Sequence, residues 1–86
     1  MNRLDDKVAI ITGGARGQGA AEAELFVAAG AQVVITDVLD AEGAATAEQL
    51  GASCEFVHHD VASEAAWADV VDTVVERHGR VDVLVN

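Results

Sequence analysis

The chain alternates short apolar runs with longer stretches that are rich in alanine. Four runs of apolar and β-branched residues occupy positions 7–12, 32–36, 54–58 and 81–85. A run of this kind, without regular alternation of polar residues, is typical of a strand that is covered on both faces. We therefore predict four strands of a parallel sheet.

The stretches between these runs predict helices. Residues 20–29 and 41–50 combine alanine with glutamate and leucine, and Gly30 and Gly51 follow them directly, where a glycine commonly ends a helix. Asp40 precedes the second stretch and is its expected N-cap.

The third helix has the clearest period. Its apolar side chains recur at the i, i+3, i+4 and i+7 spacing of a helix, which predicts one buried stripe with the tryptophan as a core residue. We expect Ser63 to cap its start and Gly79 to end it. The stripe consists of Trp67, Val70, Val71, Val74, Val75 and His78, and the opposite, solvated face carries Asp69, Asp72 and Glu76.

Strands that alternate with helices imply parallel strands joined by right-handed crossovers. The sequence therefore predicts an α/β fold with a doubly wound parallel sheet, of which residues 1–86 form a βαβαβαβ portion. The third and fourth strands are the expected edges of this sheet. The run at 81–85 is an apolar edge with no turn or polar tail behind it, so we expect a truncated domain that belongs to a longer protein.

Composition excludes several classes of protein. A net charge of −10 would repel a phosphate backbone, so we expect no nucleic-acid partner. The single cysteine, Cys54, rules out an internal disulfide framework, and its place in a strand indicates a buried structural thiol. The chain contains no run of about 18 apolar residues, so the sequence predicts no membrane span. The polar start of the chain lacks a signal peptide's apolar stretch, which indicates a cytosolic protein.

A glycine-rich turn joins the first strand to the first helix. Gly13, Gly17 and Gly19 have the spacing G-x-x-x-G-x-G. The first glycine lets the chain turn out of the strand, the second lets backbone approach a pyrophosphate, and the third lets the helix pack against the sheet. Amides at the start of the helix then face the phosphates. The glycine order G-x-G-x-x-G and the lysine of a Walker loop are both absent. The alternative to a phosphate-binding turn is a glycine-rich turn with a structural role alone.

An acidic residue follows at the end of the second strand. Asp37 lies 24 positions after Gly13, near the offset of roughly 20 residues that is typical of a carboxylate binding the ribose of a dinucleotide. The alternative is a turn residue ahead of the second helix.

These motifs together resemble the short-chain dehydrogenase/reductase family, in its classical branch. The resemblance covers the whole chain and rests on four segments: Thr12-Gly13-x-x-x-Gly17-x-Gly19, Asp37, Asp60-Val61, and Val85-Asn86 as the start of an Asn-Asn-Ala-Gly segment. It implies a Rossmann fold, with the Asp60–Val61 pair at the adenine ring and Asn86 near the adenosine ribose. Gln18 departs from the family's usual isoleucine or leucine; its backbone is still expected to meet the cofactor, and its side chain faces either the nicotinamide ribose or solvent. There are alternatives to the cofactor roles of Asp60 and Asn86. Asp60 could instead be a turn residue, and Asn86 could instead link the ends of neighbouring strands.

Two side chains give opposite indications about the cofactor. Arg16 suits the 2′-phosphate of NADP, whereas Asp37 suits the ribose hydroxyls of NAD. A carboxylate about 4 Å from a phosphate costs roughly 4 kcal/mol at an effective dielectric near 20. An exposed arginine contact returns about 1 kcal/mol or less. We therefore predict NAD as the cofactor, with NADP disfavoured.

The resemblance also implies an activity, namely hydride transfer between NAD(H) and an alcohol or ketone. The chain is most similar to hydroxysteroid dehydrogenases and 3-oxoacyl-carrier-protein reductase-like members, which are commonly homotetramers or homodimers. The family's catalytic serine and Tyr-x-x-x-Lys pair cannot be placed, because the chain has no tyrosine and its one lysine is Lys7. We thus assign cofactor binding, and no catalytic residue, to these 86 residues.

Two other functions remain open from the residues alone. One is a non-catalytic dinucleotide-binding module, and the other is an S-adenosylmethionine-dependent methyltransferase, whose usual G-x-G core is missing here. His58 and His59 are adjacent in a strand and point to opposite faces, so we predict no metal site.

Overall fold

The computed structural model describes residues 4–86, in which strands and helices alternate strictly. The strands are β1 (Val8–Thr12), β2 (Gln32–Asp37), β3 (Cys54–His58) and β4 (Val83–Val85). The helices are α1 (Gly17–Ala28), α2 (Asp40–Leu50) and α3 (Glu64–His78). Residues 1–3, which belong to the polar start used to predict a cytosolic protein, lie outside the described residues.

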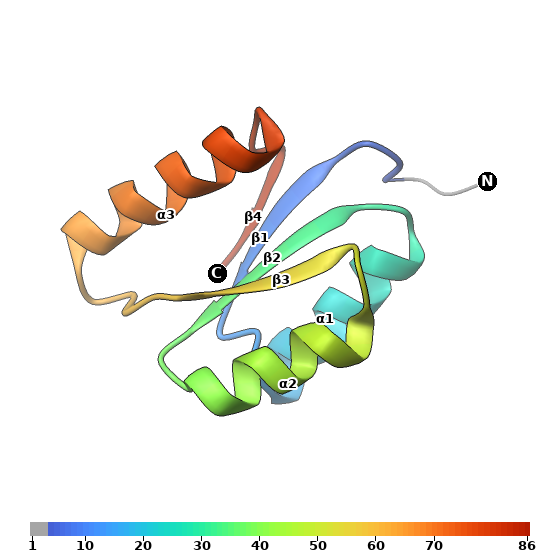
Figure 1. Ribbon diagram of the computed structural model, residues 1–86, viewed down its shortest axis with the longest axis horizontal. Helices are drawn as coiled ribbons and strands as arrows, with labels where there is room; N and C mark the ends of the chain where they lie inside the picture. The colour runs from blue at the N-terminus through green and yellow to red at the C-terminus, as the bar shows by residue number, and fades with distance from the viewer. Residues whose placement is uncertain (1–3) are drawn as a thin grey trace.

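The four strands form one parallel sheet in the order β3-β2-β1-β4. The register places Ile10 opposite both Val34 and Leu84. Helices α1 and α2 cover one face of the sheet and α3 covers the other, as Figure 1 shows. The predicted doubly wound α/β fold is confirmed, and β3 and β4 are its edges.

The core divides into two apolar layers, one on each face of the sheet. Ile11 and Ile35 pack toward α1 and α2, whereas Ile10 and Val34 pack toward Val70 and Val74 of α3. Neighbouring residues of a strand point to opposite faces, so a strand covered on both sides needs an apolar residue at every position. This explains why residues 8–11 of β1 and 33–35 of β2 are continuously apolar.

Two of the predicted helix starts are wrong. Helix α1 begins at Gly17 rather than at residue 20, because the end of the glycine-rich turn already forms its first turn. Asp40 lies inside α2, and Leu39 holds the N-cap position without a side-chain bond. The Asp37 carboxylate accepts the Leu39 amide instead, and the Asp40 carboxylate lies 2.6 Å from the His58 imidazole.

The third helix confirms its predicted ends but only part of its predicted stripe. Ser63 accepts the Ala66 amide at the N-cap, and Gly79 closes the helix with a φ of +87°. Val70 and Val74 are buried, whereas Val71 and Val75 are 39% and 43% exposed. Trp67 is half-buried and lies outside both apolar layers, so its assignment to the core is wrong. No helix within residues 4–86 is long and apolar enough to cross a membrane.

Candidate functional site

A cavity of about 320 Å³ opens at the carboxyl ends of the strands. The chain runs outward through β1, β2 and β3 and then returns to place β4 on the other side of β1. Open α/β sheets bind their ligands outside the carboxyl ends of the strands, at the point where the strand order reverses in this way. The lining residues are Thr12, Gly13, Asp37, Val38, His59, Asp60, Val61 and Asn86.

Two glycines of the glycine-rich turn make close contacts that leave no room for a side chain. Gly13 leaves β1 with a φ of +66°, which confirms the predicted sharp turn. A Cβ at Gly19 would lie 2.2 Å from the Gly13 carbonyl oxygen, so this glycine lets α1 close on the turn rather than on the sheet as predicted. The glycine that approaches the sheet is Gly14, where a Cβ would lie 2.6 Å from the Cβ of Ile35.

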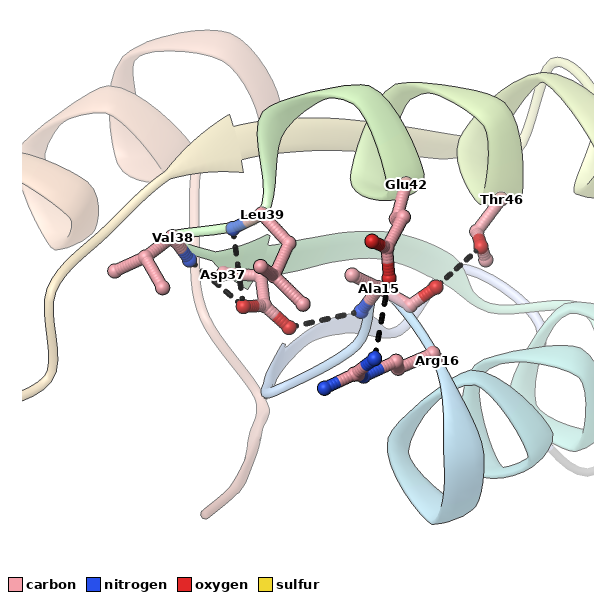
Figure 2. Close-up of polar contacts among 7 residues, drawn as sticks. All are labelled: Ala15, Arg16, Asp37, Val38, Leu39, Glu42 and Thr46. Atoms are coloured by element: carbon pink, nitrogen blue, oxygen red, sulfur yellow. Dashed lines mark hydrogen bonds and ion pairs between the residues drawn. The ribbon is translucent and has the colours of Figure 1, made fainter.

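Three hydrogen bonds hold this turn against its neighbours. The Gly14 amide donates to the Thr36 carbonyl at 3.1 Å, and the Ala15 amide donates to Oδ2 of Asp37 at 3.2 Å. Thr46 of α2 donates its hydroxyl to the Ala15 carbonyl at 2.6 Å (Figure 2). The turn is therefore fixed by β2 on one side and by α2 on the other.

The start of α1 leaves amide groups available to a ligand. The first amides of a helix have no acceptor within the helix, and the Arg16 side chain at the N-cap makes no capping bond. The first turn also contains no acidic residue. These amides and the helix dipole together favour an anion at this position.

Asp37 both organises the chain after β2 and lines the cavity. Its Oδ1 accepts the amides of Val38 and Leu39 at 2.7 and 3.2 Å, and Figure 2 shows its Oδ2 facing Ala15. The turn role that we considered as an alternative is thus present. A carboxylate offers about four lone-pair sites, so these three bonds leave acceptor capacity on the cavity side.

Arg16 lies beside this network and outside the cavity lining. Its guanidinium is 3.7 Å from the Glu42 carboxylate of α2, and the two side chains are 73% and 51% exposed (Figure 2). An exposed pair at this distance contributes about 1 kcal/mol or less.

Two valines form apolar walls of the cavity at equivalent places in the fold. Val38 follows Asp37 after β2, and Val61 follows Asp60 after β3; the valines are 51% and 52% exposed. Asp60 accepts the amide of Ala62 at 2.9 Å, so its turn role is also present. The repeated Asp-Val pair is the sequence signal that identifies Val38, which the sequence analysis missed.

Asn86 closes the cavity at the end of β4. Its Oδ1 accepts the Thr12 hydroxyl at 3.0 Å and so links the ends of β1 and β4. This is the strand link that we considered as an alternative, and it leaves the amide nitrogen of Asn86 available as a donor.

The structure thus gathers some of the predicted site residues and separates others. Gly13, Asp37, Asp60, Val61 and Asn86 share the cavity. Arg16, Gly17, Gln18 and Gly19 stand beside it in the turn and in the first turn of α1, with Gln18 exposed. Thr12, Val38 and His59 line the cavity without having been predicted.

The two adjacent histidines diverge. His58 is exposed and lies against Asp40, whereas His59 is 2% exposed and lies 3.3 Å from the Thr36 hydroxyl. Within residues 4–86 no three histidine, cysteine or acidic side chains come together as a metal would require.

The shape and chemistry of this site fit a dinucleotide. Gly13 and Gly17 both have open space where a Cβ would project, so backbone is accessible to a ligand at these positions. The helix start suits a phosphate, the carboxylate suits the hydroxyls of a ribose, and the two apolar walls suit a base.

Comparison with known proteins gives consistent relatives. Residues 7–86 match the family model described as short chain dehydrogenase. The chain is 50% identical to tropinone reductase-like 2 of Erythroxylum coca and 49% identical to 3-alpha-(or 20-beta)-hydroxysteroid dehydrogenase of Mycobacterium bovis. Each match covers 98% of this chain and 30% or 32% of the relative, so the chain spans about a third of the length of the curated relatives it matches.

A solved structure agrees with these sequence matches. The crystal structure of a short chain dehydrogenase from Mycobacterium smegmatis superposes with a TM-score of 0.94 at 35% identity, over 100% of this chain and 38% of that one. The chain therefore belongs to the short-chain dehydrogenase family.

Proposed function

We propose that this chain is the cofactor-binding portion of an oxidoreductase that transfers a hydride between NAD(H) and an alcohol or ketone. The observation that carries the proposal is the cavity at the switch point of the sheet, with Asp37 and the glycine-rich turn at its rim. The family uses NAD or NADP, and the nicotinamide supplies the hydride acceptor or donor when it is bound.

Each part of the cavity has a proposed role. The amides of the first turn of α1 bind the diphosphate, and Asp37 accepts hydrogen bonds from the ribose hydroxyls. Val38 and Val61 hold the adenine ring between them, and the Asp60 carboxylate faces its amino group. Asn86 donates toward the adenosine ribose from the end of β4.

We further propose NAD rather than NADP as the preferred cofactor. In the proposed binding mode the Asp37 carboxylate accepts the ribose hydroxyls, so its charge would oppose a 2′-phosphate, and three backbone amides already hold this carboxylate in place. Arg16, a cation in the glycine-rich turn beside the cavity, lies within ion-pair distance of Glu42. Repulsion of a phosphate by Asp37 therefore exceeds the attraction that Arg16 offers.

The substrate that we propose is a small molecule with a secondary alcohol or ketone. The relatives named 3-alpha-(or 20-beta)-hydroxysteroid dehydrogenase and trans-4-hydroxycyclohexanecarboxylate dehydrogenase are both named after an alcohol whose molecule contains a carbon ring, which supports a substrate of this kind. The 86 residues contain no tyrosine, so we expect the chain alone to bind cofactor without turning over substrate. The homo-oligomer and the cytosolic location stay predictions.

Calorimetric titration of the chain with NADH, NADPH and S-adenosylmethionine tests the proposal. We expect NADH to bind most tightly, and Asp37→Ser to weaken NADH binding about tenfold or more through the loss of hydrogen bonds to a charged acceptor. Asp72→Ser is the matched control, because it removes an exposed acidic charge from α3 and should leave NADH affinity unchanged. Tighter binding of NADPH would contradict the NAD assignment, and binding of S-adenosylmethionine alone would contradict the oxidoreductase.

A further inference from the structure

His59 is the most deeply buried polar side chain at the cavity. It is 2% exposed, and it is tied to β2 twice: its amide donates to the Asp37 carbonyl at 3.0 Å, and its Nδ1 lies 3.3 Å from the Thr36 hydroxyl. Its Nε2 is buried with no hydrogen-bond partner among the described residues. Nothing in the proposed function uses this imidazole.

Trp67 contacts both this imidazole and the cavity wall. The rings of His59 and Trp67 meet edge to face, with their centroids 4.4 Å apart and their planes at 80°. The indole Nε1 then donates to the Val61 carbonyl at 3.1 Å. A half-buried tryptophan of α3 thereby reaches back over the turn that precedes its own helix.

The turn over residues 60–63 has few other restraints. The Asp60 carboxylate accepts the Ala62 amide, and the Ser63 amide donates to the Asp60 carbonyl. Both bonds lie within the turn, so they shape it without fixing where it stands over the cavity. Ser63 ties the end of the turn to α3 as its N-cap. The contacts of His59 with β2 and of Trp67 with Val61 fix the part of the turn that faces the cavity.

We propose that His59 and Trp67 are positioning residues that hold the Asp60–Val61 turn in place as the wall for a purine base. The inference rests on the proposed function, since it takes the cavity as the site of the adenine ring. The imidazole acts as a rigid ring against which the indole is seated, and the indole N–H sets the distance of Val61 from Val38 across the cavity.

A purely structural pair would stabilise the chain without affecting which base it binds. The readout that separates the two roles is the preference for adenine over hypoxanthine, measured as the ratio of the dissociation constants of nicotinamide hypoxanthine dinucleotide (reduced) and NADH. This ratio reports on the wall next to the base, because the two ligands differ only at the base.

Trp67→Phe keeps an aromatic ring and removes the indole donor. We expect NADH binding to weaken about fivefold, the effect of one neutral hydrogen bond, and the base preference to fall by a similar factor. Thr73→Val is the control, because it removes a hydrogen bond to the Asp69 carbonyl on the same helix, away from the turn. It should leave both quantities unchanged.

His59→Phe and His59→Ala separate the ring from its nitrogens. We expect the phenylalanine variant to keep the base preference within about twofold, because the ring contact remains, and the alanine variant to lose it as Trp67→Phe does. Equal losses in the two His59 variants would overturn the proposed role of the ring.

The outcomes distinguish the two proposals. If the unmodified chain binds NADH and Trp67→Phe has the same base preference, the positioning role is wrong and the proposed function stands. If the unmodified chain binds neither dinucleotide, both are wrong. Circular dichroism of each variant confirms that the compared chains are folded.

Discussion

At the scale of single residues, the contact between Gly19 and Gly13 sets the shape of the glycine-rich turn. A Cβ at position 19 would lie 2.2 Å from a backbone carbonyl oxygen that has no freedom to move aside. At Gly17 a Cβ would meet nothing within 4 Å, although the φ of +63° disfavours any side chain there. The two glycines therefore serve different needs within one motif.

We predict that Gly19→Ala weakens NADH binding more than tenfold, because the turn must shift to admit the methyl group. Gly17→Ala should cost about 1–2 kcal/mol of stability through its backbone conformation and disturb the turn less. Thermal unfolding and calorimetric titration of both variants measure the two effects. Equal loss of NADH affinity in the two variants would count against the contact between Gly19 and Gly13.

The thiol of Cys54 gives a second prediction at this scale. Burial, with a smaller contribution from the neighbouring Glu55 carboxylate, raises the pKa of Cys54 to about 11. The side chain is 8% exposed, so both access and thiolate content are low. We expect a chromogenic disulfide reagent at about pH 8 to react with the folded chain at least tenfold more slowly than with the urea-unfolded chain. Reaction at equal rates would show that the thiol is accessible.

The sequence predicts the site residues that belong to a recognisable motif. It predicts poorly those that only tertiary contacts bring to the site. Asp37 and Asp60 follow strands at recognisable places, and five predicted residues share the cavity. His59 and Trp67 were assigned to other roles, because their contact joins residues that belong to no common motif. The hydrogen bond from the Ala15 amide to Asp37 could not be predicted for the same reason, because only the fold brings these two segments together.

At the scale of elements, the edge strand β4 is held to β1 through a carboxylate. Oδ2 of Asp82 accepts the Val8 amide at 2.8 Å and also the Nε of Arg80 at 2.8 Å. The Val8 amide above all, and then Arg80 and Lys7, hold the pKa of Asp82 below its ordinary value of 3.8. A carboxyl whose pKa is lower in the folded chain stabilises it above the unfolded pKa, and this stabilisation is lost as the pH falls through the folded pKa.

We therefore predict that Asp82→Asn lowers the urea midpoint relative to the unmodified chain at about pH 6, and that the difference shrinks at about pH 3. Asp72→Asn, on the exposed face of α3, is the control and should show no such dependence. A difference that does not change with pH would indicate that the charge of Asp82 contributes nothing to the attachment of β4.

The order and type of every element follow from the sequence, whereas several boundaries do not. The apolar runs specify β1 and β2 because both faces of each strand are covered. The first three residues of α1 could not be recognised, since two of the three are glycines, which have low helix propensity. The exposed edge of the α3 stripe has the same spacing as its buried edge, so periodicity alone could not separate Val71 and Val75 from Val70 and Val74.

At the scale of the whole molecule, the topology turns a line of separate motifs into one site. Residues 12, 37, 60 and 86 lie far apart along the chain, and the parallel order β3-β2-β1-β4 brings them to one edge of the sheet. The glycine-rich turn, the carboxylate after β2 and the valine walls then present their groups to the same cavity. We propose that this edge of the molecule binds the adenosine diphosphate half of the cofactor.

Amide chemical-shift mapping of the isotope-labelled chain during titration with NAD tests this claim most directly. We predict that the shifted amides cluster at the carboxyl edge of the sheet, around Gly13, Gly17, Val38 and Val61. Loops at the opposite edge, around Gly30 and Gly51, should not move. Shifts confined to that opposite edge, or no shifts at saturating NAD, would show that the cofactor does not bind at the carboxyl edge.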